Sequence, residues 1–321
     1  MSTEFHYADP PLLLEHVSDD VQQVVELFER GAPYKPLGGW FRPDANSEAL
    51  SAMWFQKDWV FEDYMLAGAE LFFHHAGFIE AAKKFYNAEV VIPRSIYVNL
   101  MAAIAEGGPA HTDNPAFSGR DRSNTPMMLL RTMLWSGLFN DWLIKQATSI
   151  WWMDDVEGGG LYYWPNGPTQ PPAQHVDSMA NTALVGDNHG MFHQVGPVGP
   201  FDHGTRMVGA NAELAPANDG SDDWVVIDRG EEVYRAPLGQ FRASVLWKAD
   251  VYANEEERRR MTSETLSLDD VVNIFNQDLA SRDAVFRLQR EKLEDPMHIA
   301  ELGAIYPEAI PVGACKSMFD V

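Results

Sequence analysis

The sequence predicts a mainly β domain, either a barrel or a sandwich, with helical segments at both ends. Between residues 148 and 252, short β-branched and aromatic runs alternate with glycine- and proline-rich separators, which is typical of antiparallel all-β architectures. Before residue 89 and after residue 252, apolar residues recur at helical spacing instead. We therefore expect one domain over residues 1–321, made of a helical part (1–88), a β core (89–252) and a second helical part (253–321).

The helical parts are expected from capping residues that precede periodic apolar runs. Ser18-Asp19-Asp20 precedes VQQVVELFERG, and a second helical region is expected from about Asn46 to Tyr86. On the C-terminal side, Ser267 and Asp270 form the pattern of a capping box before VVNIFNQDLASRDAVFRLQREKL. That helix is expected either to pack across the barrel or to form a dimer contact, so a homodimer through the terminal helices is one option.

The β core begins where the texture changes at Glu89. EVVIPRSIYVNLMAAI reads as one or two strands, and later runs such as TSIWWM, LYYW, MFHQV and WVVID are separated by turn residues. FRASVLWKADVY is expected to be the closing strand. The segment MMLLRTMLWSGLFNDWLIKQ fits either a helix interrupted at Gly137 or two buried segments, because periodicity does not distinguish them.

The charge balance restricts the classes of partner. Asp and Glu number 47 against 24 Lys and Arg, so the formal net charge is −23. Such a field repels phosphate backbones and anionic lipid surfaces, and we therefore expect no nucleic-acid or membrane partner. The single cysteine, Cys315, excludes an intrachain disulfide and fits a reducing cytoplasm. The N-terminal residues lack the basic and apolar regions of a signal peptide, so the expected location is cytoplasmic.

The most informative segment is GGPAHTDNP, in which His111 and Asp113 lie two residues apart at the end of an expected strand. Residues i and i+2 of a strand point to the same side, so one metal ion could bind both side chains. His193, in the later run MFHQV, could return to the same interior. Two histidines and one carboxylate form a facial triad whose open positions suit iron(II). His189 is the alternative distal histidine, but it lies in the turn-like stretch DNHG.

Further polar residues lie on strands that would face the same interior. Arg242 and Ser244 share one face of the closing strand, where a guanidinium and a hydroxyl could bind a carboxylate. Asn99 precedes the metal motif and could donate a hydrogen bond to a bound carboxylate; otherwise it is a satisfied core amide. Lys248 lies on the face of Ser244 in principle, or points to solvent.

In this order, His111-Thr112-Asp113, His193 and Arg242-Ala243-Ser244 resemble the pattern of the iron(II)/2-oxoglutarate-dependent oxygenase superfamily. The resemblance covers roughly residues 90 to 252 and implies a double-stranded β-helix, a jelly-roll and cupin-like barrel wrapped by helices. The spacing departs from the family, because its arginine usually follows the distal histidine more closely than Arg242 does. Arg206 is therefore the competing anchor, although Arg242 has the partner Ser244 and the alternation of a barrel strand.

The resemblance implies an enzyme that uses Fe(II), 2-oxoglutarate and O2. His111, Asp113 and His193 would bind the metal, and Arg242, Ser244 and Asn99 would bind the cosubstrate. The implied reaction is hydroxylation, desaturation or cyclisation of a small organic molecule or amino-acid derivative, with release of succinate and CO2. Two rivals belong to other classes. One is a cupin-type dioxygenase or isomerase that does not use 2-oxoglutarate, and the other is a β-barrel binding protein without catalysis.

Overall fold

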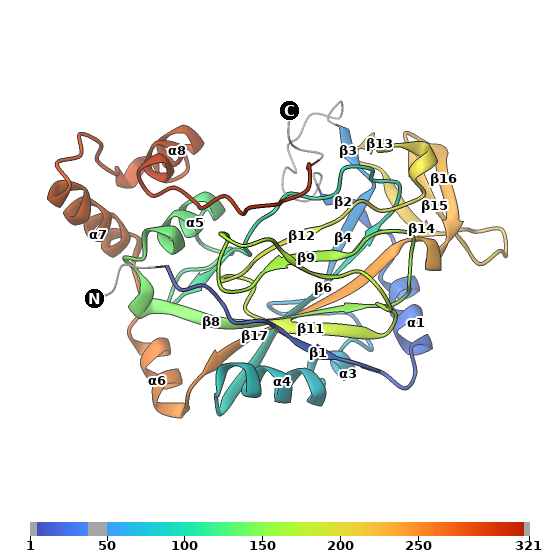
Figure 1. Ribbon diagram of the computed structural model, residues 1–321, viewed down its shortest axis with the longest axis horizontal. Helices are drawn as coiled ribbons and strands as arrows, with labels where there is room; N and C mark the ends of the chain where they lie inside the picture. The colour runs from blue at the N-terminus through green and yellow to red at the C-terminus, as the bar shows by residue number, and fades with distance from the viewer. Residues whose placement is uncertain (1–4, 38–49, 318–321) are drawn as a thin grey trace.

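The computed structural model describes residues 5–37 and 50–317. Its centre is a nine-stranded antiparallel sheet (Figure 1). In sheet order, the strands are β1 (Leu12–Leu14), β11 (Thr182–Gly186), β8 (Leu143–Trp152), β17 (Arg242–Tyr252), β6 (Val90–Met101), β4 (Trp54–Phe61) and β2 (Lys35–Pro36), with β5 (Tyr64–Met65) on β4 and β7 (Ala116–Phe117) on β8.

A smaller sheet lies over one face of the large sheet. Its strands are β10 (Ala173–His175), β9 (Leu161–Trp164) and β12 (Phe192–Val195). Leu161 and Val195 of this sheet pack with Ile150 and Leu246 of the large sheet in one buried cluster. The two sheets are hydrogen-bonded separately, and the described residues form no single closed barrel. The mainly β prediction is therefore confirmed, whereas the jelly-roll barrel remains a prediction.

Two further sheets, at the right of Figure 1, use strands that lie between β12 and β17 in the sequence, together with one strand from before β4. They are formed by β13 (Met207–Gly209) with β3 (Leu50–Ala52), and by β14 (Glu213–Pro216), β15 (Asp223–Asp228) and β16 (Glu231–Pro237). The expected strand WVVID lies here as β15. The segment that forms β13 to β16 accounts for the long separation between His193 and Arg242.

The other face of the large sheet is covered by helices α3 (Glu70–Phe73) and α4 (Ala76–Tyr86) (Figure 1). Trp247 of β17 donates from Nε1 to the carbonyl of Phe73 at 2.9 Å, and its ring lies 5.7 Å from that of Phe78. Because successive residues of a strand point to opposite faces, Leu246 and Lys248 must point away from these helices. Leu246 joins the cluster between the sheets, and Lys248 lines a cavity.

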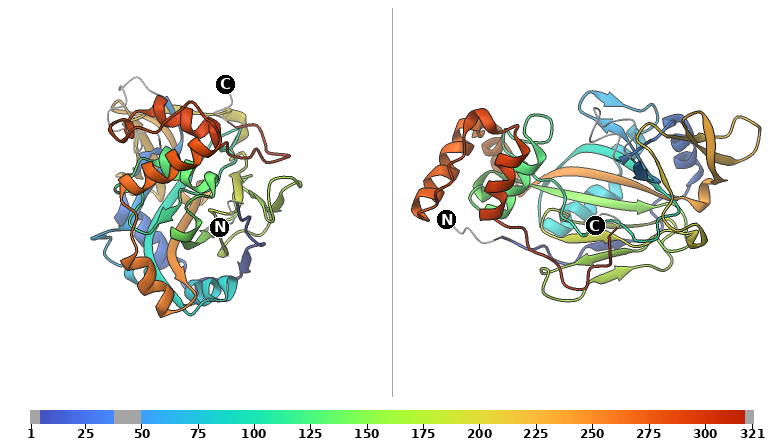
Figure 2. Two further views of the ribbon diagram at one scale, coloured as in Figure 1. Left: turned by 90° about the vertical axis from the view of Figure 1, so that its left-hand side faces the viewer. Right: turned by 90° about the horizontal axis from the view of Figure 1, so that it is seen from above.

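The C-terminal helices gather at one end of the molecule (Figure 2). They are α6 (Glu255–Ser263), α7 (Leu268–Ser281) and α8 (Pro296–Ile305). α7 and α8 pack with α5 (Met127–Ser136) in a separate buried cluster, so α7 does not cross a barrel. The capping box is confirmed, since Ser267 and Asp270 bond reciprocally. The ambiguous segment after Pro126 is the helix α5, which ends at Gly137 with a φ of 65°, followed by β8.

The prediction that residues 1–88 are helical is wrong in its middle part. α1 (Gln22–Gly31) and α4 are helices, but Trp54–Phe61 forms β4, which pairs with β6 over most of its length. The aromatic residues of this segment occur at a spacing that also fits a helix, and the long neighbouring strand decides the outcome by pairing its backbone. Residues 46–49 of the expected helix lie outside the described residues. No described helix has the length and apolarity that crossing a membrane requires.

Candidate metal centre

The side chains of His111, Asp113 and His193 converge on one point. One ligand atom from each lies within 4.8 Å of the others, and the residues come from two segments that pair through their backbones. The amide of His111 donates to the carbonyl of His193 at 3.0 Å, and the amide of His193 donates back at 2.9 Å. This pair places the two imidazoles side by side with ring centroids 4.4 Å apart, and Asp113 lies two residues further on. The set predicted from the sequence is therefore the set that the structure brings together.

Both imidazoles are oriented by backbone carbonyls. His111 Nδ1 lies 2.9 Å from the carbonyl oxygen of Pro109, and His193 Nδ1 lies 3.2 Å from that of Met191. A neutral imidazole that donates from Nδ1 keeps a lone pair on Nε2, which is the atom a metal ion binds. Burial, together with the neighbouring His193, lowers the pKa of His111 to about 4. Burial also lowers the pKa of His193. The two rings are thus neutral near neutral pH.

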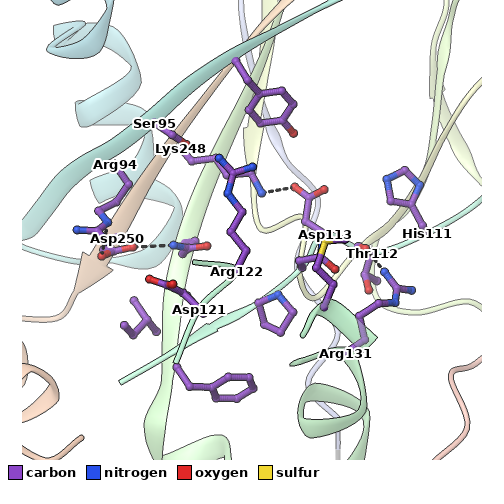
Figure 3. A pocket seen from close by; sticks show the side chains of 18 of the residues that line it. Arg94, Ser95, His111, Thr112, Asp113, Asp121, Arg122, Arg131, Lys248 and Asp250 are labelled. Atoms are coloured by element: carbon purple, nitrogen blue, oxygen red, sulfur yellow. Dashed lines mark hydrogen bonds and ion pairs between the residues drawn. The ribbon is translucent and has the colours of Figure 1, made fainter. Parts of the chain in front are cut away.

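The carboxylate of Asp113 has different partners on its two oxygens. Oδ1 lies 3.6 Å from His193 Nε2, and Oδ2 accepts a hydrogen bond from Lys248 Nζ at 2.8 Å (Figure 3). Burial on its own raises the pKa of Asp113, but Lys248 and the two histidines outweigh it and hold the pKa well below its ordinary value. Asp113 is therefore ionised, as a metal ligand must be.

The centre opens onto a cavity of about 1320 Å³ (Figure 3). Two arginine–aspartate pairs lie on its walls. Arg122 Nη2 lies 3.3 Å from Asp58, and Arg94 Nε lies 3.3 Å from Asp250. Aromatic and amide side chains of β4 and β6 complete the wall, namely Trp54, Gln56 and Tyr97. The cavity is thus lined by both signs of charge beside apolar surface.

Arg131 and Gln194 connect the metal-binding segments to the chain near the C-terminus. Arg131 donates from Nη1 to the carbonyl of Thr112 at 2.9 Å and from Nη2 to Glu308. Gln194 donates to the carbonyls of Gly108 at 2.7 Å and Cys315 at 2.9 Å, and it accepts from the amide of Cys315 at 2.8 Å. Sequence reasoning did not find either residue, because each acts through backbone groups that are distant in the chain.

Arg242 and Ser244 lie deeper between the sheets and are not part of the cavity lining. Arg242 is 3% exposed; its Nε donates to the carbonyl of Gly159 at 2.5 Å, and its Nη1 lies 3.4 Å from Ser244 Oγ. Nη2 is buried and has no hydrogen-bond partner, and no described acid pairs with the guanidinium. Burial lowers the pKa of Arg242 to about 9. A buried guanidinium without a counter-ion is costly unless a ligand supplies one.

Asn99 is held in place by two donors. Its Oδ1 accepts from Trp54 Nε1 at 2.9 Å and from Gln56 Nε2 at 2.5 Å. Trp54 and Gln56 line the cavity, whereas Asn99, the cross-strand partner of Gln56, is buried and is not part of the lining.

The two alternatives from the sequence lie elsewhere. Arg206 donates to the carbonyl of Val233 at 2.6 Å and stacks over Tyr234 of β16, outside the cavity lining. His189 is buried near Asp113, but it does not join the convergent set. Lys248 is the reverse case, since its side chain faces the metal centre and not the solvent.

Comparison with known proteins yields structural neighbours only. No family model matches the chain, and no curated protein matches it. Among solved structures, it is similar to an oxidoreductase of the 2OG-Fe(II) oxygenase family from Burkholderia pseudomallei (11% identity, 76% of this chain, 86% of that chain, TM-score 0.42). It is also similar to a Pseudomonas putida prolyl-4-hydroxylase (10%, 75%, 92%, TM-score 0.35) and to AviO1 from Streptomyces viridochromogenes (10%, 76%, 90%, TM-score 0.39).

Members of the 2OG-Fe(II) oxygenase family are thus among the neighbours of this chain, and the chain carries a His-x-Asp…His triad. The identities and TM-scores are low, so this likeness says nothing about a substrate or a reaction.

Proposed function

We propose that the protein is a non-haem Fe(II)- and 2-oxoglutarate-dependent oxygenase. The observation that carries the proposal is the buried triad of His111, Asp113 and His193, with both imidazole Nε2 atoms and one carboxylate oxygen directed at one point. Two neutral imidazoles and one carboxylate suit Fe(II) and leave open positions for other ligands. The donor set therefore fits the metal.

The 2-oxoglutarate site rests on Arg242. No acid among the described residues pairs with the guanidinium, its Nη2 is an orphaned buried donor, and Ser244 lies within reach. An Arg fork binds a carboxylate through parallel hydrogen bonds. Arg242 and Ser244 would bind the distal carboxylate of the cosubstrate, and Asn99 is a further candidate contact. Arg206 is disfavoured because its guanidinium lies on the β16 side.

When bound, iron and 2-oxoglutarate together activate O2 for removal of hydrogen from a substrate, with release of succinate and CO2. The chain itself would orient the metal ligands, exclude water from the buried centre and hold the substrate in the cavity. We propose hydroxylation, desaturation or cyclisation of a small organic molecule or amino-acid derivative. The paired charges of Arg122 with Asp58 and of Arg94 with Asp250 support a polar substrate.

The test is the visible spectrum of the anaerobic, metal-free protein during addition of Fe(II) and then 2-oxoglutarate. We expect a weak charge-transfer band that requires both additions and is absent in His193→Ala. If Asp113→Ala bound Fe(II) with wild-type affinity, Asp113 would not be a metal ligand.

One observation favours a second candidate. Because Arg242 and Ser244 do not line the cavity, a cupin-type metal-dependent dioxygenase or isomerase that does not use 2-oxoglutarate is the alternative. This candidate predicts that Fe(II) binds to the triad but that 2-oxoglutarate produces no band.

A further inference from the structure

The two oxygens of Asp113 have different partners, because Lys248 bonds to only one of them. Its Nζ holds Oδ2 at 2.8 Å, and the other oxygen, Oδ1, lies on the side of His193. The side chains of Lys248 and Asp113 are 14% and 11% exposed, so the ion pair is largely withdrawn from solvent. The oxygen that faces the imidazole is therefore the one presented to a metal ion.

The backbone around Lys248 leaves little freedom for this contact to move. Lys248 is paired with Thr148 of β8 on one side and with Ser95 of β6 on the other. Both neighbours are buried. The register of β17 with β6 shifts directly after Lys248, and bulges of this kind occur where a strand must aim a side chain.

Within the described chain, Asp113 is the acid to which Lys248 bonds. A buried ammonium group needs a counter-ion, because an unpaired charge withdrawn from water is strongly unfavourable. The ion pair between Lys248 and Oδ2 is therefore favoured. While it persists, Oδ2 of Asp113 is not available to bind a metal ion.

We propose that Lys248 is a positioning residue that restricts Asp113 to binding the metal through one oxygen. This inference rests on the proposed function. A six-coordinate ion held by two imidazoles and one carboxylate oxygen would have three further positions, and a chelating keto acid would take two of them. A second oxygen from Asp113 would take the last one. Lys248 would thereby leave one position available to O2 when the metal and the cosubstrate are bound.

If Lys248 positions Asp113, its replacement should change metal affinity and the access of a further ligand to the metal separately. A purely structural role would weaken both together. Replacing Lys248 with methionine frees Oδ2, so Asp113 can chelate and the metal should bind at least as tightly. Replacing Lys248 with arginine places two parallel donors opposite the carboxylate, which can engage both oxygens and compete with the metal. The two variants should therefore change the metal site in opposite directions.

The experiment uses Fe(II), 2-oxoglutarate and nitric oxide, which binds ferrous iron at an open position, under anaerobic conditions. In Lys248→Met, we expect Fe(II) affinity equal to or above that of the wild type, but at least a tenfold weaker nitric oxide signal in electron paramagnetic resonance once 2-oxoglutarate is bound. In Lys248→Arg, we expect at least tenfold weaker Fe(II) binding. Lys57→Met is the matched control, because that cavity lysine donates to the carbonyls of Gly31 and Pro33.

A Lys248→Met variant that binds nitric oxide like the wild type would overturn the inference, as would loss of Fe(II) binding in a folded Lys248→Met protein. If circular dichroism shows that Lys248→Met does not fold, the Fe(II) affinity of Lys248→Arg decides, and wild-type affinity there would refute the idea. Failure of the wild type to bind Fe(II) or 2-oxoglutarate would instead contradict the proposed function, so the two failures are distinguishable.

Discussion

At the scale of single residues, the candidate metal centre depends on backbone carbonyls that fix two imidazole rings. The sequence predicted His111, Asp113 and His193, because a two-residue spacing and a later histidine in an apolar run carry that information locally. It did not predict the role of Lys248, since the side-chain direction of one strand residue depends on the register of three strands. The sequence predicted that Arg242 lies on an inward face of the closing strand. It did not predict that the guanidinium is buried with an unpartnered Nη2.

The buried guanidinium gives the first expectation at this scale. Arg242→Met should raise the apparent Michaelis constant for 2-oxoglutarate roughly tenfold to a hundredfold, because a hydrogen bond to a charged group contributes about 1.5–3 kcal/mol. Steady-state succinate formation measures this constant. Arg206→Met is the control and should leave it unchanged; the opposite ranking would move the anchor to Arg206.

The neutral imidazoles give a second expectation, for the metal-free protein. Burial lowers the pKa of His111 to about 4 and that of His189 to about 3, against an ordinary value near 6.5. The unfolded chain then binds more protons than the folded one from about pH 6.5 down to about pH 4 for His111 and about pH 3 for His189. Stability is therefore fully present above this window and falls as pH drops through it. The loss is at most about 1.4 kcal/mol per pH unit for each histidine.

Urea unfolding at several pH values tests this dependence. His189→Gln should flatten the slope, whereas His203→Gln should not, because His203 is a surface residue with a 43% exposed side chain. An unchanged slope in His189→Gln would show that other groups cause the pH dependence.

At the scale of elements, the positions of strands along the chain were easier to predict than the strands with which they pair. β9, β12, β15 and β17 follow from short β-branched and aromatic runs bounded by turns, and they lie where they were expected. β4 was mistaken for helix because its partner β6 is distant in the sequence. α8 lies within the helical part expected over residues 253–321, although no separate helix was expected there. The pairing of His111 with His193 is also a contact between elements, and no local pattern encodes it.

The C-terminal segment around Cys315 provides an expectation for this scale. Gln194 is fully buried, and it satisfies both backbone groups of Cys315 as well as the carbonyl of Gly108. Gln194→Ala should lower the free energy of unfolding by about 1–3 kcal/mol, because buried polar groups lose their partners. It should also increase proteolysis within residues 307–317. Gln174→Ala, at an exposed position of β10, is the control for both measurements.

At the scale of the whole molecule, composition indicated a folded, strongly acidic chain, and the structure supplies the arrangement that composition could not. Two sheets pack face to face, helices α3 and α4 cover the outer face, and the C-terminal helices gather at one end. This layering depends on which distant strands pair with one another. Local sequence patterns do not encode that pairing, so they could not distinguish a closed barrel from two separate sheets. The site lies where the two sheets meet at the cavity.

The net charge of −23 sets a global expectation. Self-repulsion among like charges weakens a compact state, and added salt screens it. Raising NaCl from about 20 mM to about 300 mM should therefore raise the Tm by a few degrees. Sucrose, which does not screen charge, serves as the comparison, and a Tm that falls with NaCl would show that specific ion pairs outweigh the repulsion.

The two faces of β17 have a consequence for the evolution of this chain. One face carries Val245 and Trp247 against the helices, and the other carries Arg242, Ser244 and Lys248 towards the interior. Loss or gain of one residue within the strand would exchange these faces and remove the site in a single step. The segment that forms β13 to β16 precedes β17 in the chain and belongs to other sheets. Insertions and deletions should therefore be tolerated in that segment and selected against within β17.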